Sequence, residues 1–186
     1  GGCILLRREA LQRIGGIAAI RDALIDDCSL AAAVKRSRPA GGGGIWLGLA
    51  EGARSIRPYA GLTPIWNMVA RTAYTQLYHS PLLLAGTLIG MGLTYLLPPL
   101  LLLAAPWHQQ PWTALAAGLA WLLMGLSLLP TLRLYRQPWW IAALLPLAAG
   151  LYSAMTFDSA WRHWRGVGGQ WKGRVQGKHA GPDARG

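Results

Sequence analysis

Asp26 and Asp27 form the one pair of adjacent carboxylates in the sequence. They stand at the start of Asp27 to Lys35, a segment rich in Ala and Leu and followed by Arg36, which suits a helix C-terminus. At the N-terminus of such a helix, unpaired N–H groups and a partial positive charge favour ionised carboxylates. One Asp can cap the helix while the other accepts a proton from an incoming hydroxyl, as a general base does. The alternative is two capping carboxylates and nothing more.

The other reactive side chains form no familiar catalytic or metal-binding pattern. The sequence has no Ser/His/Asp set, no Walker loop and no zinc spacing, and no third metal ligand lies close to the Asp pair. His79 and His108 stand beside interfacial segments, so we expect them at a lipid surface. Cys3 and Cys28 lack metal-ligand spacing, which favours reduced thiols facing the cytosol, with a disulfide as the alternative.

The composition is that of a membrane protein. Hydrophobic residues make up 53% of the chain and charged residues only 13%. The formal net charge of +11 is also compatible with nucleic-acid binding, but the basic residues are scattered around apolar segments without a dense Lys/Arg run. Attraction to anionic lipid headgroups explains this distribution better, so we expect a membrane partner and no nucleic acid.

Residues 81–158 are expected to hold three transmembrane helices. The three apolar segments are Leu82 to Ala105, Thr113 to Leu132 and Trp139 to Phe157, close to the roughly 20 residues of one crossing. In the first, Gly86 and Gly90 provide a small-residue face for close helix approach, and Pro98-Pro99 should kink or end the helix. Tryptophans cluster at the segment ends, as in interfacial belts: Trp107, Trp112, Trp139, Trp140, Trp161 and Trp164.

Residues 61–80 are expected to form an amphipathic helix on the membrane surface. Thr63 suits the N-cap and Pro64 the first helical position. Steps of three and four place on one face Leu62, Ile65, Trp66, Val69, Ala73 and Leu77. The opposite stripe carries Asn67, Arg71, Tyr74 and Tyr78. Such a helix keeps its apolar face among headgroups and presents Arg71 away from them. The alternative is a helix packed on a soluble core.

The two ends of the chain read as soluble. In residues 1–60 the pattern predicts a small-residue turn and then a short apolar strand within 1–6, a helix over Arg7 to Ile14 ended by Gly15-Gly16, and strands over Ile45 to Leu49 and Ser55 to Arg57. Residues 159–186 are expected to be a basic interfacial or disordered tail. Because the sequence starts at Gly1 without Met, we expect a fragment or a processed piece.

The basic residues give conflicting signals about orientation. The loop over residues 106–111 lacks Lys and Arg and should lie outside, whereas Arg133 and Arg136 should lie inside with the N-terminal region. Three crossings then place Arg162 and Arg165 outside, against the positive-inside rule. Either the tail violates the rule or one segment is re-entrant or interfacial, with Leu82 to Ala105 as the candidate.

Several motifs resemble family-2 glycosyltransferases. GGCILLRREALQRIGGI is similar to their acceptor-side segment, and Ile25-Asp26-Asp27-Cys28 matches their Glu-Asp motif with Asp26 in place of Glu. The resemblance implies that Asp27 is the catalytic base. Residues 68–72, Met-Val-Ala-Arg-Thr, stand where processive members carry Gln-x-x-Arg-Trp and keep only Arg71, which the resemblance places on the donor diphosphate. It also implies an acceptor-side position for Gly2, Trp66 and Met68.

One subgroup is more similar still. WNMVARTAYTQLYHSPLLLAGTLIGM and IRDALIDDCSLA resemble the hopanoid-biosynthesis-associated membrane glycosyltransferases of bacteria. The late residues 170–174, Gln-Trp-Lys-Gly-Arg, resemble the Trp-x-Gly-Arg ending of related lipid-modifying members. Together the similarities cover most of the chain through Arg174.

The resemblance implies the C-terminal part of an α/β glycosyltransferase domain of GT-A type, followed by about three membrane helices. The implied reaction is inverting sugar transfer from a nucleotide-sugar donor to a lipid acceptor, a hopanoid, at the cytosolic face of the bacterial inner membrane. A divalent cation, Mg²⁺ or Mn²⁺, is implied for the whole enzyme, with ligands absent from this chain, so the chain alone should be inactive. The alternative is a non-catalytic membrane anchor or assembly subunit with a basic cytosolic head.

Overall fold

The computed structural model describes residues 3–21, 23, 25–37, 44–50, 52, 60–167, 170–171 and 174–175. The chain divides into two compact units, Gly1–Tyr59 with Gly169–Gly186, and Ala60–Gly168. We describe each unit by itself, beginning with the unit that contains both chain ends.

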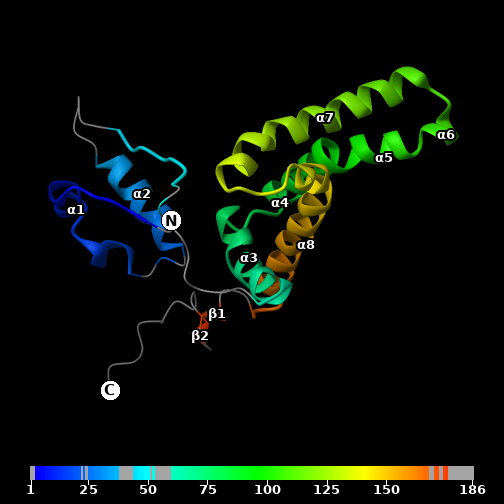
Figure 1. Ribbon diagram of the computed structural model, residues 1–186. Helices are drawn as coiled ribbons and strands as arrows, with labels where there is room; N and C mark the ends of the chain where they lie inside the picture. Colours follow the sequence, from blue (N-terminus) through cyan, green and yellow to red (C-terminus); the bar gives the residue numbers. More distant parts are fainter. Residues whose placement is uncertain are drawn as a thin grey trace. The chain divides into compact units, whose positions relative to one another are not determined.

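Among its described residues, the first unit has three short helical elements, α1 (Arg8–Arg13), the 3₁₀ turn η1 (Ile17–Ile20) and α2 (Asp26–Arg36) (Figure 1). Gly15 and Gly16 follow α1 with φ of 85° and 79°, a left-handed conformation that suits glycine and ends the helix as the pattern predicts. Both α1 and η1 contact α2, with Ala10 and Leu30 buried. Two strands of two residues, β1 (Gln170–Trp171) and β2 (Arg174–Val175), pair antiparallel.

The predicted α/β fold of GT-A type is wrong for this structure. Within the described residues the predicted strands at 1–6 and 45–49 are not strands, and the one sheet is the β1–β2 pair. A short apolar run becomes a strand only where a neighbour satisfies its backbone N–H and C=O groups. Neither run has such a neighbour in the described part of the unit. The predicted strand at 55–57 lies outside the described residues.

The described part of the second unit consists of helices joined by short turns. After α3 (Leu62–Gln76) the chain continues through α4 (Pro81–Met91), the π-helical turn η2 (Gly92–Leu96) and α5 (Leu97–Leu103). It then turns through α6 (Ala105–His108), returns as α7 (Pro111–Leu134), and ends with the 3₁₀ segment η3 (Trp139–Leu144) and α8 (Leu145–Trp164). In the part of the chain that the structure describes, three stretches are long and apolar enough to cross a membrane: Pro81–Leu103, Pro111–Leu134 and Trp139–Trp164.

Local chemistry explains where these helices begin and bend. Ser80 caps α4 by accepting the Leu83 N–H at 3.3 Å, and Pro81 suits the first helical position. Pro98 and Pro99 have no N–H to donate to the turn before them, and that turn widens into η2. The helix therefore continues through the two prolines instead of ending there. The predicted cap of α3 at Thr63 is replaced by Gly61, with φ of 86°.

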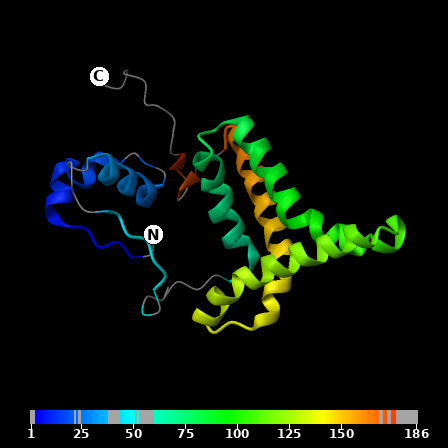
Figure 2. The same ribbon diagram turned by 90° about the horizontal axis from the view of Figure 1, so that it is seen from above.

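The two halves of the first long stretch, before and after the bend at η2, pack against different helices. The start of α4 packs near the end of α8, because Leu84 forms a buried cluster with Tyr74 and Ala160. At the opposite end of α8, a Cβ on Gly150 would lie 3.6 Å from Leu96 in η2. The next segment, α5, instead lies along α7 (Figures 1 and 2). The start of α4 and the end of α8 are therefore at the same end of their antiparallel pair.

Little of this unit's apolar surface is buried within it. Large side chains such as Leu82, Leu122 and Leu147 are exposed on the three long stretches, as expected for surfaces that face lipid. The space beside Gly86 and Gly90 is also open, since a Cβ on either glycine would meet nothing within 4 Å. Among the described residues, the predicted small-residue face thus makes no close helix contact.

Candidate functional site in two parts of the chain

The end of α8 holds α3 in place through small and polar side chains. Ala160 is 0% exposed and Tyr74, on α3, is 2% exposed, so the tyrosine ring fills the space that Ala160 leaves. Ser159 accepts the backbone N–H of Tyr74 at 3.0 Å. The Tyr74 hydroxyl donates to the carbonyl oxygen of His79 at 2.7 Å. Tyr74, predicted on the stripe opposite the apolar face, is therefore buried against α8.

A polar bridge joins the first turns of α3 to the last turns of α8. The indole Nε1 of Trp66 donates to Oδ2 of Asp158 at 2.7 Å. Arg162, one turn along α8, makes an ion pair with the same oxygen at 2.7 Å through Nη2. Through Nη1 it also donates to Oδ1 of Asn67 at 3.0 Å. The Asp158 side chain keeps 25% of its surface exposed, so this bridge is partly open to the surroundings.

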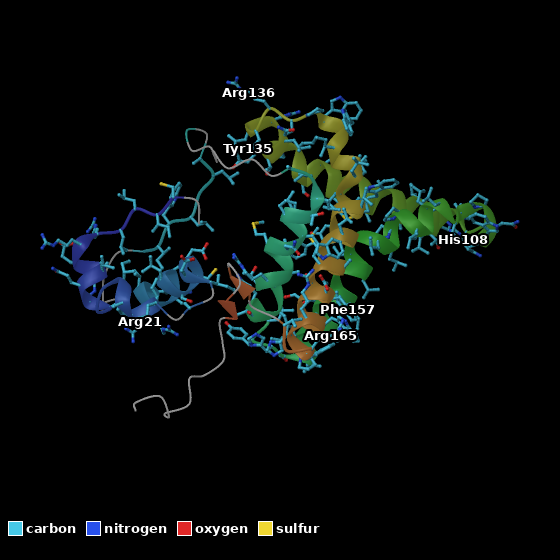
Figure 3. The ribbon with its side chains drawn as sticks, turned by 90° about the horizontal axis from the view of Figure 1, so that it is seen from below. Arg21, His108, Tyr135, Arg136, Phe157 and Arg165 are labelled. Atoms are coloured by element: carbon cyan, nitrogen blue, oxygen red, sulfur yellow. The ribbon has the colours of Figure 1, made fainter. Side chains whose placement is uncertain are left out.

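An open groove of about 530 Å³ lies directly beside the bridge. Its walls are aromatic and aliphatic except for one carboxylate, and its lining residues are Trp66, Ala154, Phe157, Asp158 and Trp161. Figure 3 shows Phe157 on α8, near the helix end that carries Arg165. The arrangement can hold an apolar body against the aromatic rings while presenting one hydrogen-bond acceptor.

A cluster of rings closes the same end of the α3–α8 pair. The imidazoles of His79 and His163 stack with centroids 4.2 Å apart and planes 19° apart. Tyr74 meets both imidazoles and Trp164 edge-on. Burial lowers the pKa of His79 from its ordinary value, and the charge of His163 acts in the same direction. The cluster therefore favours a neutral His79.

The acidic pair lies in the first unit, within the first turn of α2. The N-cap of α2 is Ile25, so neither carboxylate occupies the capping position. Oδ1 of Asp26 accepts the N–H of Asp27 at 2.9 Å, and Oδ1 of Asp27 accepts the N–H of Cys28 at 2.8 Å. Asp26 is exposed and Asp27 is half-buried, so the two carboxylates have different surroundings.

The other predicted site residues are distributed between the units. Arg71 and Met68 share α3 with Trp66, with Arg71 half-buried and Met68 exposed. Gly2 lies outside the described residues. The structure brings Trp66 together with Asp158, whereas Asp27 and Arg71 belong to separately described units. Within the described ranges, no group of three or more His, Cys, Asp or Glu side chains is placed to hold a metal ion.

Residues 1–175 match the family model described as Glycosyl transferase family 21. The chain belongs to this family. The match covers all of Ala60–Gly168, with the whole α3–α8 bridge, and the other unit as far as residue 175, with the start of α2. It supports a glycosyltransferase but gives no support to the family-2 assignment or to the hopanoid subgroup. No curated protein and no solved structure gives a significant match.

The sequence motifs of this family 21 chain did not identify Asp158 and Arg162 as site residues. Both lie at the predicted boundary between the third span and the tail, so neither was considered as a site. A signal was present, because Asp158 is the one acidic residue between Glu51 and Asp183. An isolated carboxylate at the end of an apolar segment, with an arginine four residues later, indicates a specific partner.

Proposed function

We propose that this chain acts in a membrane-bound, inverting glycosyltransferase that moves a sugar from a nucleotide-sugar donor to a lipid hydroxyl, with a hopanoid as acceptor. The observation that carries the proposal is the family 21 match over residues 1–175, which includes three helices long and apolar enough to cross a membrane. Such helices give the enzyme direct access to a lipid acceptor. The choice of a hopanoid rests on the resemblance of residues 66–91 and 20–31.

In this reaction Asp27 is the general base. It would remove the proton of the acceptor hydroxyl as that oxygen attacks the anomeric carbon, and the nucleoside diphosphate would leave from the opposite face. The position of Asp27 in the first turn of α2 supports this role, because the helix N-terminus favours an ionised carboxylate. Asp26, exposed beside it, would act as electrostatic support.

Arg71 would stabilise the negative charge that develops on the leaving diphosphate. Its guanidinium is half-buried on α3, the helix whose other residues Trp66 and Met68 are proposed for the acceptor side. Among the described residues, no three His, Cys, Asp or Glu side chains are placed to bind the divalent cation that the resemblance implies. We therefore assign no step of the reaction to a metal ion.

The proposed site of action is the cytosolic face of the bacterial inner membrane. The basic residues Arg162 and Arg165 at the end of α8 lie at the same end as the start of α4, which supports placing both at a face rich in anionic lipid. Gly2 is proposed for the acceptor side on resemblance alone.

The proposed function is tested by identifying the lipid product of the reaction. Membranes containing the whole enzyme are incubated with labelled nucleotide sugars and a hydroxylated hopanoid, and the lipid extract is analysed by mass spectrometry and NMR. We expect a hopanoid that is heavier by one sugar residue, with the anomeric configuration inverted relative to the donor. A deoxy hopanoid is the matched control and should stay unmodified. Absence of any glycosylated lipid with every donor would instead favour the non-catalytic anchor.

A further inference from the structure

The groove beside the Trp66–Asp158 bridge contains an unusual residue for its location. Asp158 lies in Trp139–Trp164, one of the three stretches long and apolar enough to cross a membrane. A carboxylate in such a stretch is costly unless it is paired, and it commonly marks a functional site. Packing alone does not require it, because the adjacent Tyr74, Leu84 and Ala160 already form an apolar contact between the helices.

The carboxylate has spare capacity for a ligand. Trp66 and Arg162 both bind Oδ2 of Asp158, and among the described residues Oδ1 accepts no hydrogen bond. An ionised carboxylate offers about four acceptor sites, so one oxygen remains available to a hydroxyl donor. Asp158 itself lines the groove, whose other lining residues are apolar or aromatic.

We propose that this groove binds the acceptor lipid, with a hydroxyl of its polar head donating to Asp158 and its apolar body lying on Phe157 and Trp161. The proposal rests on the proposed function and specifies where the acceptor is held. Both aromatic side chains are about half exposed, at 48% and 49%, so their faces are accessible to a ligand. Asp158 acts here as a binding residue, and the base remains Asp27.

The charge of the groove selects this occupant over the donor. A nucleotide sugar carries an anionic diphosphate, and the residues that line the groove include no cation to bind it. The nearest cation, Arg162, does not line the groove and is already bound to Asp158 and Asn67. A neutral amphiphile with a hydroxylated head satisfies the carboxylate and covers the aromatic walls at once. The same end of α8 packs on α3, the helix that carries Arg71.

The test uses the whole enzyme in lipid nanodiscs and a photoreactive hopanoid alcohol. Cross-linked peptides are mapped by mass spectrometry, and the label is competed with the unlabelled alcohol or with its deoxy analogue. We expect labelling within residues 154–161, and we expect the alcohol to compete about tenfold better than the deoxy analogue, since hydrogen bonds to charged groups are the stronger kind. Asp158→Asn should remove this preference for the hydroxyl.

Two further variants keep the test independent of folding defects. Phe157→Ala removes a groove wall without touching the polar bridge, and it should raise the acceptor KM about tenfold while leaving the donor KM unchanged. Trp112→Ala, at an exposed tryptophan on α7, is the matched control and should change neither value. Equal competition by alcohol and deoxy analogue would show ordinary boundary lipid and overturn the proposal.

The outcomes separate this proposal from the proposed function. Hydroxyl-selective labelling at residues 154–161 without any sugar transfer would support the groove and contradict the glycosyltransferase activity on hopanoids. Sugar transfer with labelling elsewhere, and with Phe157→Ala at wild-type acceptor KM, would support the activity and overturn the groove.

Discussion

The indole N–H of Trp66 reaches across 92 positions of sequence to Oδ2 of Asp158, at 2.7 Å. This bond fixes the start of α3 against the last turns of α8, while Tyr74 fixes its end through Ser159. The two attachments define the orientation of α3, and with it the direction in which Arg71 and Met68 leave the helix.

Trp66→Phe should loosen the start of α3 while keeping an aromatic side chain at this position. The lost hydrogen bond is to a charged group but is partly exposed, so we expect a cost of about 1 kcal/mol. Hydrogen exchange in detergent should show weaker protection of the first two turns of α3, with α7 unchanged. Trp112→Phe serves as the control. Unchanged protection in Trp66→Phe would mean that the bridge does not hold α3.

Ala160→Leu should separate α3 from α8. Ala160 has no exposed surface and lies against Tyr74, so a larger side chain overpacks the contact and costs about 1–3 kcal/mol. The apparent thermal midpoint in detergent should fall. Ala148→Leu, at an exposed position on the same helix, should leave the midpoint nearly unchanged. Equal midpoints for both variants would contradict the close packing at Ala160.

Acidification should weaken the ring cluster at the end of α3. Because the pKa of His79 is lowered in the folded protein from 6.5, the unfolded chain binds a proton more readily there. The stabilisation is complete above the unfolded pKa and is lost as the pH falls from about 6.5 to below the folded value. His79→Gln should reduce the loss of thermal stability between pH 7.5 and 5. A pH profile of His79→Gln identical to wild type would exclude this cause.

The start of α4 and the end of α8 should be accessible from the same side of the membrane. His79 and His163 stack at 4.2 Å, which places the two chain segments together. In a chain with Cys3 and Cys28 replaced by serine, single cysteines at Tyr78 and Val167 should react with an impermeant reagent from one and the same side. Labelling from opposite sides would contradict the α4–α8 arrangement.

The three long apolar stretches could be predicted because lack of charge over about 20 residues is a property of the sequence alone. The side of the membrane on which Arg162 lies could not be predicted in that way. The position of Arg162 relative to the first span depends on the bend at η2, since the end of α8 packs near the start of α4. Pro98 and Pro99 signalled a break, but the sequence does not show which neighbour each half then contacts.

The differences between prediction and structure at Tyr74 and at Ile45 to Leu49 have a common physical cause. Periodicity in one segment describes its own faces and contains no information about the partner. Helical spacing placed Tyr74 on the stripe opposite the apolar face, yet Ala160 and Ser159 on α8, far away in the sequence, create a site for its ring. The run Ile45 to Leu49 has strand composition, but composition does not supply a pairing neighbour.

The central claim, lipid glycosylation with Asp27 as base, is tested most directly by the initial rate of sugar transfer in membranes carrying Asp27→Asn, with Asp26→Asn as the matched control. Asp27→Asn removes the proton acceptor with little change in shape and should lower the rate about 10²–10⁴-fold, with donor affinity retained. Asp26→Asn should cost far less, because Asp26 is exposed and an Asn there keeps a side-chain oxygen that can accept the N–H of Asp27. Loss of activity only in Asp26→Asn would reverse the assignment, and full activity in both variants would contradict the catalytic role of the pair.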